Sequence, residues 1–350
     1  MYFGDPENGV GINVRERIGH EVWKKDEPSW QHWNDESLPL FWRAWAFQER
    51  LLARRIVHYT RQEIAWECQS DSWCECQCLD NDHELNGRFP RSTKFKTKYA
   101  EVIKHGSIQD RFLLWLSIID QYQSRRITNP GDRLPALSAI AKQISAKSDM
   151  GRYIEGMWEH WFMKSLLWWS DLDSKRVANH HETHWRPTPS AAATWSWISV
   201  EGPVTTWGRF TDWGRERRSA NDCWLLGILE NDFDPSPTTK ISVIAELTEI
   251  KIRRASDSRL CIVQANQSAR TGKFFPDTNP FEISEDLLAE KSFYALKHSL
   301  CQPTSYNCLV LAMHVDGGRT HSQYRRLGIA EVGLDWFSNE NRDRQFPILV

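Results

Sequence analysis

Residues 42–68 constrain the fold more than any other stretch of this chain. The stretch reads Trp-Arg-Ala-Trp-Ala-Phe-Gln-Glu-Arg-Leu-Leu-Ala-Arg-Arg, then Ile-Val-His-Tyr, a short polar link, and Ile-Ala-Trp-Glu-Cys. Its first part has the spacing of apolar side chains that is typical of an amphipathic helix. In its second part, the side chains follow a period of two on both sides of the polar link, which predicts two antiparallel strands in a hairpin. We therefore expect a helix and a hairpin packed as one unit.

Two polar residues interrupt the apolar side that we predict for this helix. At about 100° per residue, Gln48 and Glu49 fall beside Trp42, Trp45 and Leu52. The opposite side carries Arg43, Phe47, Arg50 and Arg54. Because burial of an amide or carboxylate without partners is costly, we expect both polar side chains to face inward and to be hydrogen-bonded. A structural pairing and a ligand-facing pocket edge would each satisfy them.

Three other features have the residue types of a reactive or metal-binding site. His58 lies on a predicted strand, where a single histidine is more often half-buried and hydrogen-bonded than catalytic. The cysteine cluster lacks the Cys-x-x-Cys pairs of structural zinc sites, and the His-Glu-Thr-His sequence is one residue short of a helical His-Glu-x-x-His motif. These two groups are Cys68, Cys74, Cys76 and Cys78, and His180, His181, Glu182 and His184. We expect no metal and no cofactor.

The overall composition fits a folded cytoplasmic protein. Hydrophobic residues make up 40% and charged residues 26% of the chain, as in ordinary globular domains. The net charge of -2 gives no general field for nucleic acid or an anionic membrane. No apolar signal segment opens the chain, and the apolar runs are too short to cross a bilayer. We therefore expect a cytoplasmic protein with no nucleic-acid and no membrane partner.

The middle of the chain is predicted to be mainly helical. A charged loop over residues 71–97 precedes Ser107 and Asp110, which have the spacing of a capping box ahead of a helix. Pro130 interrupts the pattern, and a second helix is predicted over residues 134–144. A third helix is predicted from about Arg152 toward residue 169, because aromatic and apolar side chains recur there at helical spacing.

Beyond residue 190 the pattern changes to β. Seven segments rich in branched or aromatic residues are separated by Gly, Pro and Asp. They are residues 194–200, 223–229, 241–252, 260–265, 308–315, 325–334 and 346–350. The fold class is therefore α+β. We expect a helix-and-hairpin segment at 1–70, a loop and helical region at 71–190, and a β-rich C-terminal domain at 191–350.

The chain has 19 tryptophans, which allow two interpretations. Several exposed, coplanar tryptophans between Trp195 and Trp224 would make a carbohydrate-binding β module. Large aromatic residues more often dominate core burial, and many of these tryptophans stand beside apolar residues. We therefore expect Trp195 and Trp197, on one side of a predicted strand, to be core residues.

The block at residues 42–68 resembles the closing segment of the fungal heterokaryon-incompatibility (HET) domain. Its motif residues are Arg43, Trp45, Gln48, Glu49 and Arg50. Further segments resemble, in the same order, the long region that follows this domain in HET proteins. They are Asn129-Pro-Gly-Asp-Arg-Leu-Pro, Gly156-Met-Trp-Glu, Leu166-Leu-Trp-Trp, Thr194-Trp-Ser-Trp-Ile-Ser-Val, Cys308-Leu-Val-Leu-Ala and Tyr324-Arg-Arg-Leu-Gly-Ile. The resemblance extends from about residue 40 to the end of the chain.

The resemblance implies a role in nonself recognition and programmed cell death through contacts with protein partners. The strands that open the family's α/β domain, with Tyr-x-x-Leu-Ser-Tyr-x-Trp-Gly-like and Ile-Asp-x-x-Cys-Ile-Asp-Gln-like sequences, do not precede Trp42. The first segment therefore resembles a truncated remnant of that domain, and if the family's activity needs those strands, the chain is inactive alone.

An enzymatic role is left open by the resemblance. The family's domain is thought to be distantly similar to signalling domains that consume NAD, which would make Glu49 a catalytic candidate in a death effector enzyme. The matching nucleotide-contacting segments are absent, so we assign no catalytic residue. The NAD-consuming enzyme and the carbohydrate-binding module are the alternatives to a protein that signals through contacts.

Overall fold

A computed structural model describes residues 2–5, 10–13, 39–60, 63–75, 95–123, 125–170, 192–202, 204–206, 223–229, 239–255, 259–277, 292–302, 304–314, 322–337 and 344–350. Helices and strands are both present, which confirms the α+β class. Two compact units divide the chain, Met1–Gly106 and Ser107–Val350, so the boundary between them differs from the expected boundaries at 70 and 190. In the described ranges, no helix has the length and apolar character needed to cross a membrane.

The first unit contains the predicted hairpin, extended by a third strand. Strands β3 and β4 pair antiparallel with Ile56 opposite Glu67, and β5 continues the sheet beside β4. The predicted loop from residue 71 therefore begins with a strand, and residues 76–94 of that loop lie outside the described residues. The elements are β1 (Tyr2–Asp5), β2 (Val10–Asn13), the 3-10 helix η2 (Pro39–Trp42), α2 (Ala44–Leu52), β3 (Arg55–Tyr59), β4 (Ile64–Cys68), β5 (Ser72–Cys74) and α3 (Phe95–His105).

Helix α2 buries a different side from the predicted one. Ala44, Phe47 and Leu51 are each 2% exposed, with the three-to-four-residue spacing of a single stripe. The Phe47 ring stacks on Phe95 of α3 with ring centroids 6.3 Å apart. The prediction followed the tryptophans, yet Trp45 is 38% exposed. Helix α3 thus packs on the side that we had assigned to solvent.

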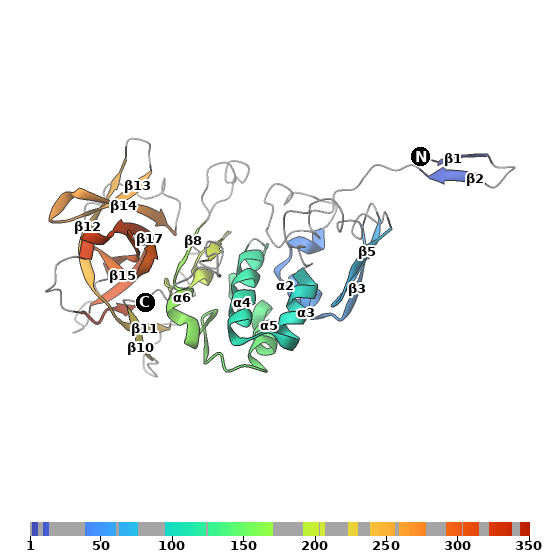
Figure 1. The fold of residues 1–350 in the computed structure, drawn as a ribbon, viewed down its shortest axis with the longest axis horizontal. Coiled ribbons are helices and arrows are strands. Elements are labelled where there is room, and N and C mark those ends of the chain that lie inside the picture. The colour runs from blue at the N-terminus through green and yellow to red at the C-terminus, as the bar shows by residue number, and fades with distance from the viewer. Residues whose placement is uncertain are drawn as a thin grey trace. The chain divides into compact units, whose positions relative to one another are not determined.

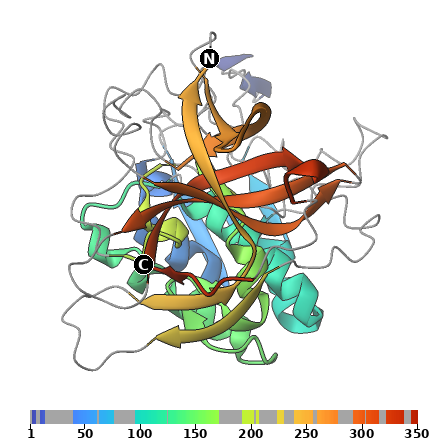
Figure 2. The ribbon, with the colours of Figure 1, turned by 90° about the vertical axis from the view of Figure 1, so that its left-hand side faces the viewer.

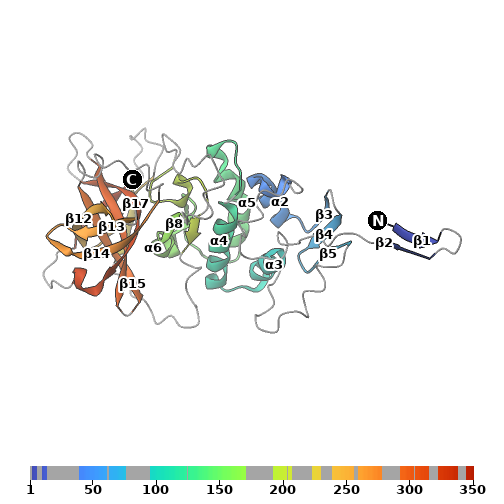
Figure 3. The same ribbon diagram turned by 90° about the horizontal axis from the view of Figure 1, so that it is seen from above.

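The second unit begins with two antiparallel helices. Helix α4 (Ile108–Tyr122) starts with the predicted capping box, because Asp110 N donates to Ser107 Oγ at 3.2 Å and Ser107 N donates to Asp110 Oδ2 at 2.9 Å. A 3-10 turn, η4 (Pro130–Asp132), separates it from α5 (Pro135–Ser145). Both Figure 1 and Figure 3 show α4 and α5 side by side. These two helix predictions are confirmed.

The third predicted helix does not form. Glu155 and Gly156 have φ values of 46° and 84°, and two successive residues of positive φ make a tight hairpin turn. A Cβ on Gly156 would meet the Trp197 ring at 2.7 Å, so glycine also allows the close packing of that indole. The segment instead contains β6 (Tyr153–Ile154), β7 (Met157–Trp158), the 3-10 helix η5 (Glu159–Trp161), α6 (Phe162–Ser165) and β8 (Trp168–Ser170).

The β-rich region is built on one nine-stranded sheet, of which six strands close into a barrel. The order is β10-β11-β18-β17-β14-β13-β12-β15-β16, and β16 returns to pair with β17. Figure 2 shows the strands curving around their shared interior. The strands of the region are β9 (Val204–Thr206), which pairs with β8, β10 (Trp224–Leu229), β11 (Lys240–Ile244), β12 (Leu247–Arg254), β13 (Leu260–Gln264), β14 (Gln267–Pro276), β15 (Phe293–Gln302), β16 (Ser305–His314), β17 (Gln323–Gly333) and β18 (Ile348–Leu349).

Several strand predictions need correction. The predicted strand at 194–200 is a turn followed by the 3-10 helix η6 (Trp197–Ser199), and the one at 241–252 is the two strands β11 and β12. Strands β14 and β15 were not predicted; both contain charged residues, and the apolar runs within them, such as residues 293–296, are short. A second short 3-10 helix, η9 (Leu334–Phe337), follows β17.

The second unit has three tiers. Figures 1 and 3 place α6 and β8 between the closed sheet and helix α4. Trp195 and Trp197, which are 0% and 1% exposed, belong to this middle tier, so the prediction that both are core residues is confirmed. Neither can form an exposed carbohydrate platform.

We expect Trp197→Ala to lower the free energy of unfolding by about 3 to 5 kcal/mol, the usual loss for emptying a large buried aromatic site. Trp197 Nε1 also donates to the Gly156 carbonyl at 3.1 Å. Chemical denaturation of the full chain measures the loss. The control is Trp224→Ala, because Trp224 is 42% exposed; an equal loss for the two variants would contradict the burial argument.

Candidate functional site

An ion-pair cluster ties α2 to the hairpin in the first unit. Arg50 donates from Nε to Glu67 Oε1 at 2.6 Å and from Nη2 to Oε2 at 2.9 Å, a bidentate geometry. His58 Nε2 lies 3.2 Å from the same Oε1. Burial opposes ionisation of Glu67, but the charge of Arg50 and the hydrogen bonds from His58 and Arg50 lower its pKa to about 2. Glu67 is therefore a fixed carboxylate, and His58 is the hydrogen-bonded structural histidine that we predicted.

Aromatic and basic groups surround this pair. The Arg50 guanidinium lies 4.6 Å from the centroid of the Phe41 ring, and the Phe41 and His58 ring centroids are 5.2 Å apart. Lys96 of α3 donates from Nζ to the Arg50 carbonyl. Burial lowers the pKa of Lys96, whereas Glu67 acts in the opposite direction. The cluster thus joins α2 to the hairpin through the buried Glu67 carboxylate, and α2 to α3 through the Arg50 carbonyl.

Cys68 lies at a small pocket beside this cluster. The pocket is lined by Arg50, Glu67, Phe95 and Lys96 among others, and its volume is about 10 Å³, about enough for one water molecule. Burial slightly opposes ionisation of the thiol, but hydrogen bonds from the Ser70 hydroxyl at 3.1 Å and from the Ser70 and Asp71 N–H groups at 3.3 Å lower its pKa. The pocket has no room for a nucleotide or a sugar ring.

Only one of the five predicted motif residues enters the cluster. Arg50 is in it, whereas Arg43 and Glu49 are exposed, Trp45 is 38% exposed and Gln48 is half-buried. The prediction that Gln48 and Glu49 both face inward is therefore wrong for Glu49, which lies opposite the buried stripe of α2. An NAD-consuming enzyme built on Glu49 would need this side chain in a cleft, whereas it is exposed.

Of the two other candidate groups, the cysteine cluster is described in part and the group at residues 180–184 is not described. Cys68 and Cys74 lie on β4 and β5, while Cys76, Cys78 and the histidines at 180–184 lie outside the described residues. In the part of the chain that the structure covers, no three His, Cys, Asp or Glu side chains are placed to hold a metal ion. The absence of a metal stays a prediction.

The outward side of the three-stranded sheet is apolar, and we call it the outer sheet face. Its residues alternate with the buried residues Ala65, Glu67, Ser72 and Cys74. Val57 is 48%, Tyr59 81% and Trp73 41% exposed. Val57 pairs across the strands with Trp66, and Trp66 with Trp73. The apolar residues of the face are Val57, Tyr59, Ile64, Trp66 and Trp73, and Arg55, Cys68, Asp71 and Glu75 lie at its borders.

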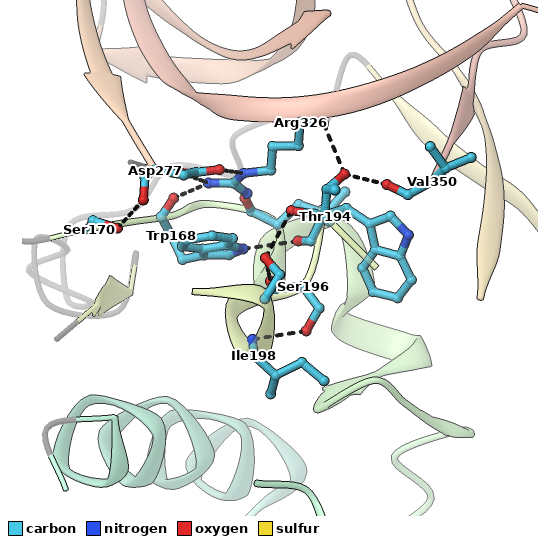
Figure 4. Close-up of polar contacts among 11 residues, drawn as sticks. Trp168, Ser170, Thr194, Ser196, Ile198, Asp277, Arg326 and Val350 are labelled. Carbon is cyan, nitrogen blue, oxygen red and sulfur yellow. Dashed lines mark hydrogen bonds and ion pairs between the residues drawn. The ribbon is translucent and has the colours of Figure 1, made fainter. Parts of the chain in front are cut away.

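A second charged pair lies at the centre of the other unit, as Figure 4 shows. Arg326 donates from Nε to Asp277 Oδ2 at 2.8 Å and from Nη2 to Oδ1 at 3.0 Å, and both side chains are 0% exposed. It also donates to the carbonyls of Leu166 and Trp168. Its guanidinium lies 3.8 Å from the centroid of the Trp168 ring. Because no solvent reaches it, we interpret this pair as a structural junction between the closed sheet and the middle tier.

Four of the segments singled out in the sequence contact residues 194–200. From the first, Arg133 donates to the Ile198 carbonyl at 3.0 Å. From the others, Trp197 donates to the Gly156 carbonyl at 3.1 Å, Trp168 to the Trp195 carbonyl at 3.0 Å, and Arg326 N to Thr194 Oγ1 at 3.1 Å. The dispersed motifs of the second unit therefore share a structural role.

Sequence reasoning missed Glu67, Lys96, Asp277 and Arg326 as the residues that organise both units. A signal existed for Glu67, because it alternates with the apolar Ala65 on a predicted strand and so required a partner. Asp277 offered no local signal, since Arg326 is 49 residues away.

The sequence matches no protein-family model, and neither a curated protein nor a solved structure was found to match it.

We expect Glu67→Gln to destabilise the protein in a pH-dependent way. Because the pKa of Glu67 is lowered from 4.5 to about 2, its ionised form contributes roughly 3 kcal/mol at neutral pH, and that contribution is lost as the pH falls from about 4.5 through about 2. Denaturant unfolding of wild type and variant across this range measures the shrinking difference. Glu49→Gln, an exposed change nearby, is the control; a difference independent of pH would contradict the assignment.

We expect Asp277→Asn to cost about 3 to 5 kcal/mol of stability, because it leaves the Arg326 charge buried without its counter-ion. The double variant Asp277→Leu/Arg326→Met should lose less than the single variant, since no charge remains buried. Glu159→Gln is the control, because its pair with Arg152 is exposed and should contribute below about 1 kcal/mol. A double variant less stable than Asp277→Asn would contradict this account.

Proposed function

We propose that this chain is an incompatibility-type signalling protein of fungal cells, and that it acts in nonself recognition and programmed cell death through protein contacts. The observation that carries the proposal is the outer sheet face, which lies within the segment that resembles the HET domain. Tyr59 at 81% and Val57 at 48% exposure place large apolar side chains where a binding partner can cover them. Contiguous exposed apolar residues of this kind mark interaction surfaces.

The chemistry of the same segment supports contact over catalysis. Arg50 of α2 and His58 of the hairpin both bond Glu67, so these polar groups stabilise the fold. The adjacent pocket, about 10 Å³, is far smaller than the clefts that hold cofactors or substrates. Glu49 projects from the solvent side of α2.

The resemblance supports the biological setting of the proposal. The order of six further motifs after the first block resembles the order found in HET proteins. The proposed role needs no cofactor and no nucleic acid.

Expression of the full chain in a filamentous fungus tests the proposal. We expect wild type to reduce cell viability or the survival of fused cells, and Val57→Asp to abolish the effect because it places a charge in the outer sheet face. The matched control is Leu226→Asp, since Leu226 of β10 is 51% exposed and lies on another sheet.

Total cellular NAD distinguishes contact signalling from the enzyme alternative. We expect NAD to remain at the level of the empty-vector control before viability falls. Wild type without any effect on viability or fusion, or Val57→Asp as toxic as wild type at equal abundance, would refute the proposal; an early loss of NAD would favour the enzyme.

A further inference from the structure

The outer sheet face has a simple arrangement of three rows across the strands. The middle row is Val57–Trp66–Trp73, set by strand pairing. One outer row is Arg55–Cys68–Asp71, because Arg55 pairs with Cys68 and Cys68 N donates to the Asp71 carbonyl at 2.7 Å. The other is Tyr59–Ile64–Glu75, because Tyr59 pairs with Ile64 and Glu75 N donates to the Ile64 carbonyl at 3.1 Å.

Opposite charges flank the apolar middle row. Arg55 lies on the β3 side and is exposed, while Asp71 and Glu75 flank β5 on the other side and are also exposed. Asp71 Oδ1 accepts from Ser72 N at 2.7 Å, and Glu75 Oε2 accepts from Ile64 N at 2.9 Å, so backbone contacts hold both carboxylates at this border. The face therefore has one basic side, an aromatic centre and one acidic side.

Such a face is complementary to itself under a two-fold rotation about an axis parallel to β4. This rotation keeps each row in place and exchanges the β3 side with the β5 side. Arg55 then faces Asp71 of a second copy, Tyr59 faces its Glu75, and Val57 faces its Trp73. Each contact occurs twice, as in any isologous interface. Trp66, at the centre of the middle row, meets its own copy on the axis.

We infer that a second copy of this chain docks on the outer sheet face, forming a two-fold dimer in which the two β3–β4–β5 sheets pack face to face. Sheets that pack in this way are separated by about 10 Å and bury the side chains between them. Aromatic residues and arginine are the types most enriched at interface hot spots, and the face offers Trp66, Trp73, Tyr59 and Arg55. A uniformly acidic or basic partner would repel one side of the face.

This inference rests on the proposed function, because it identifies a second copy of the chain as the partner that binds the outer sheet face. The two can nevertheless fail separately. A chain that dimerises but leaves fungal viability unchanged refutes the proposed function alone. A monomer that reduces viability refutes the dimer alone.

Sedimentation of the purified full chain tests the dimer first. We expect a reversible monomer–dimer equilibrium in the micromolar range. Val57→Asp should raise the dissociation constant by at least about tenfold, as for a residue central to an interface, while Leu226→Asp leaves it unchanged. Thermal melting of both variants checks that each is folded. A monomer throughout this range, or a dimer insensitive to Val57→Asp, would overturn the inference.

A charge exchange tests the proposed alignment. Arg55→Glu and Asp71→Arg should each weaken the dimer, because each places like charges opposite each other twice. The double variant Arg55→Glu/Asp71→Arg should restore association toward the wild-type value, since opposite charges face each other again. If a different protein occupied this face, the double variant would not regain the self-association that the single variants lose. Folded single variants that weaken association without rescue in the double variant would therefore overturn the self-complementary arrangement.

Discussion

The buried pair of Arg326 and Asp277 is the interaction on which the second unit depends. A guanidinium that is 0% exposed must have its donors bonded by protein groups, because water cannot reach it. Asp277 and the carbonyls of Leu166 and Trp168 bond it. Two separate parts of the chain, residues 166–168 and Asp277, are thereby held to strand β17. A buried ion pair adds little net stability over an apolar pair, so we interpret its main role as fixing the position of the closed sheet on the middle tier.

The surrounding polar groups follow the same constraint. Thr194 accepts from Arg326 N and donates from its own N to the carbonyl of Val350 at 3.1 Å. Ser170 Oγ donates to the Asp277 carbonyl at 2.8 Å. His298, also buried, lies 2.7 Å from the Met163 carbonyl through Nε2, and burial lowers its pKa to about 4. The junction therefore consists of satisfied hydrogen bonds and a neutral histidine, which is the composition of a structural core.

The first unit also depends on a buried ion pair, but one face of its sheet has an apolar, exposed centre. Glu67 is bonded by Arg50 of α2 and by His58 of β3. These bonds fix α2 on the inner side of the hairpin. Because side chains alternate along a strand, fixing that inner side also forces Val57, Tyr59 and Trp73 outward. The ion pair and the proposed contact surface are thus two consequences of one strand register.

The sequence by itself determined the elements whose signals are local. The capping box of Ser107 and Asp110, the helix after Pro130 and the hairpin of strands β3 and β4 depend on neighbours a few positions away. The burial of Trp195 and Trp197 also followed from their apolar bulk. The helix expected after Arg152 failed because two residues of positive φ, Glu155 and Gly156, outweigh the apolar spacing of about eighteen residues.

Only the tertiary structure decided which polar groups meet. Arg50 and Glu67 are 17 residues apart, and Arg326 and Asp277 are 49 residues apart. The sequence around either arginine does not indicate which carboxylate it will pair with. Pairing at such separations depends on sheet closure and helix packing, which no short window of sequence contains. The buried side of α2 was decided in the same way, because α3 supplies Phe95 against Phe47. Local preference sets the elements, whereas burial of charge and of aromatic area selects the single arrangement that satisfies every partner at once.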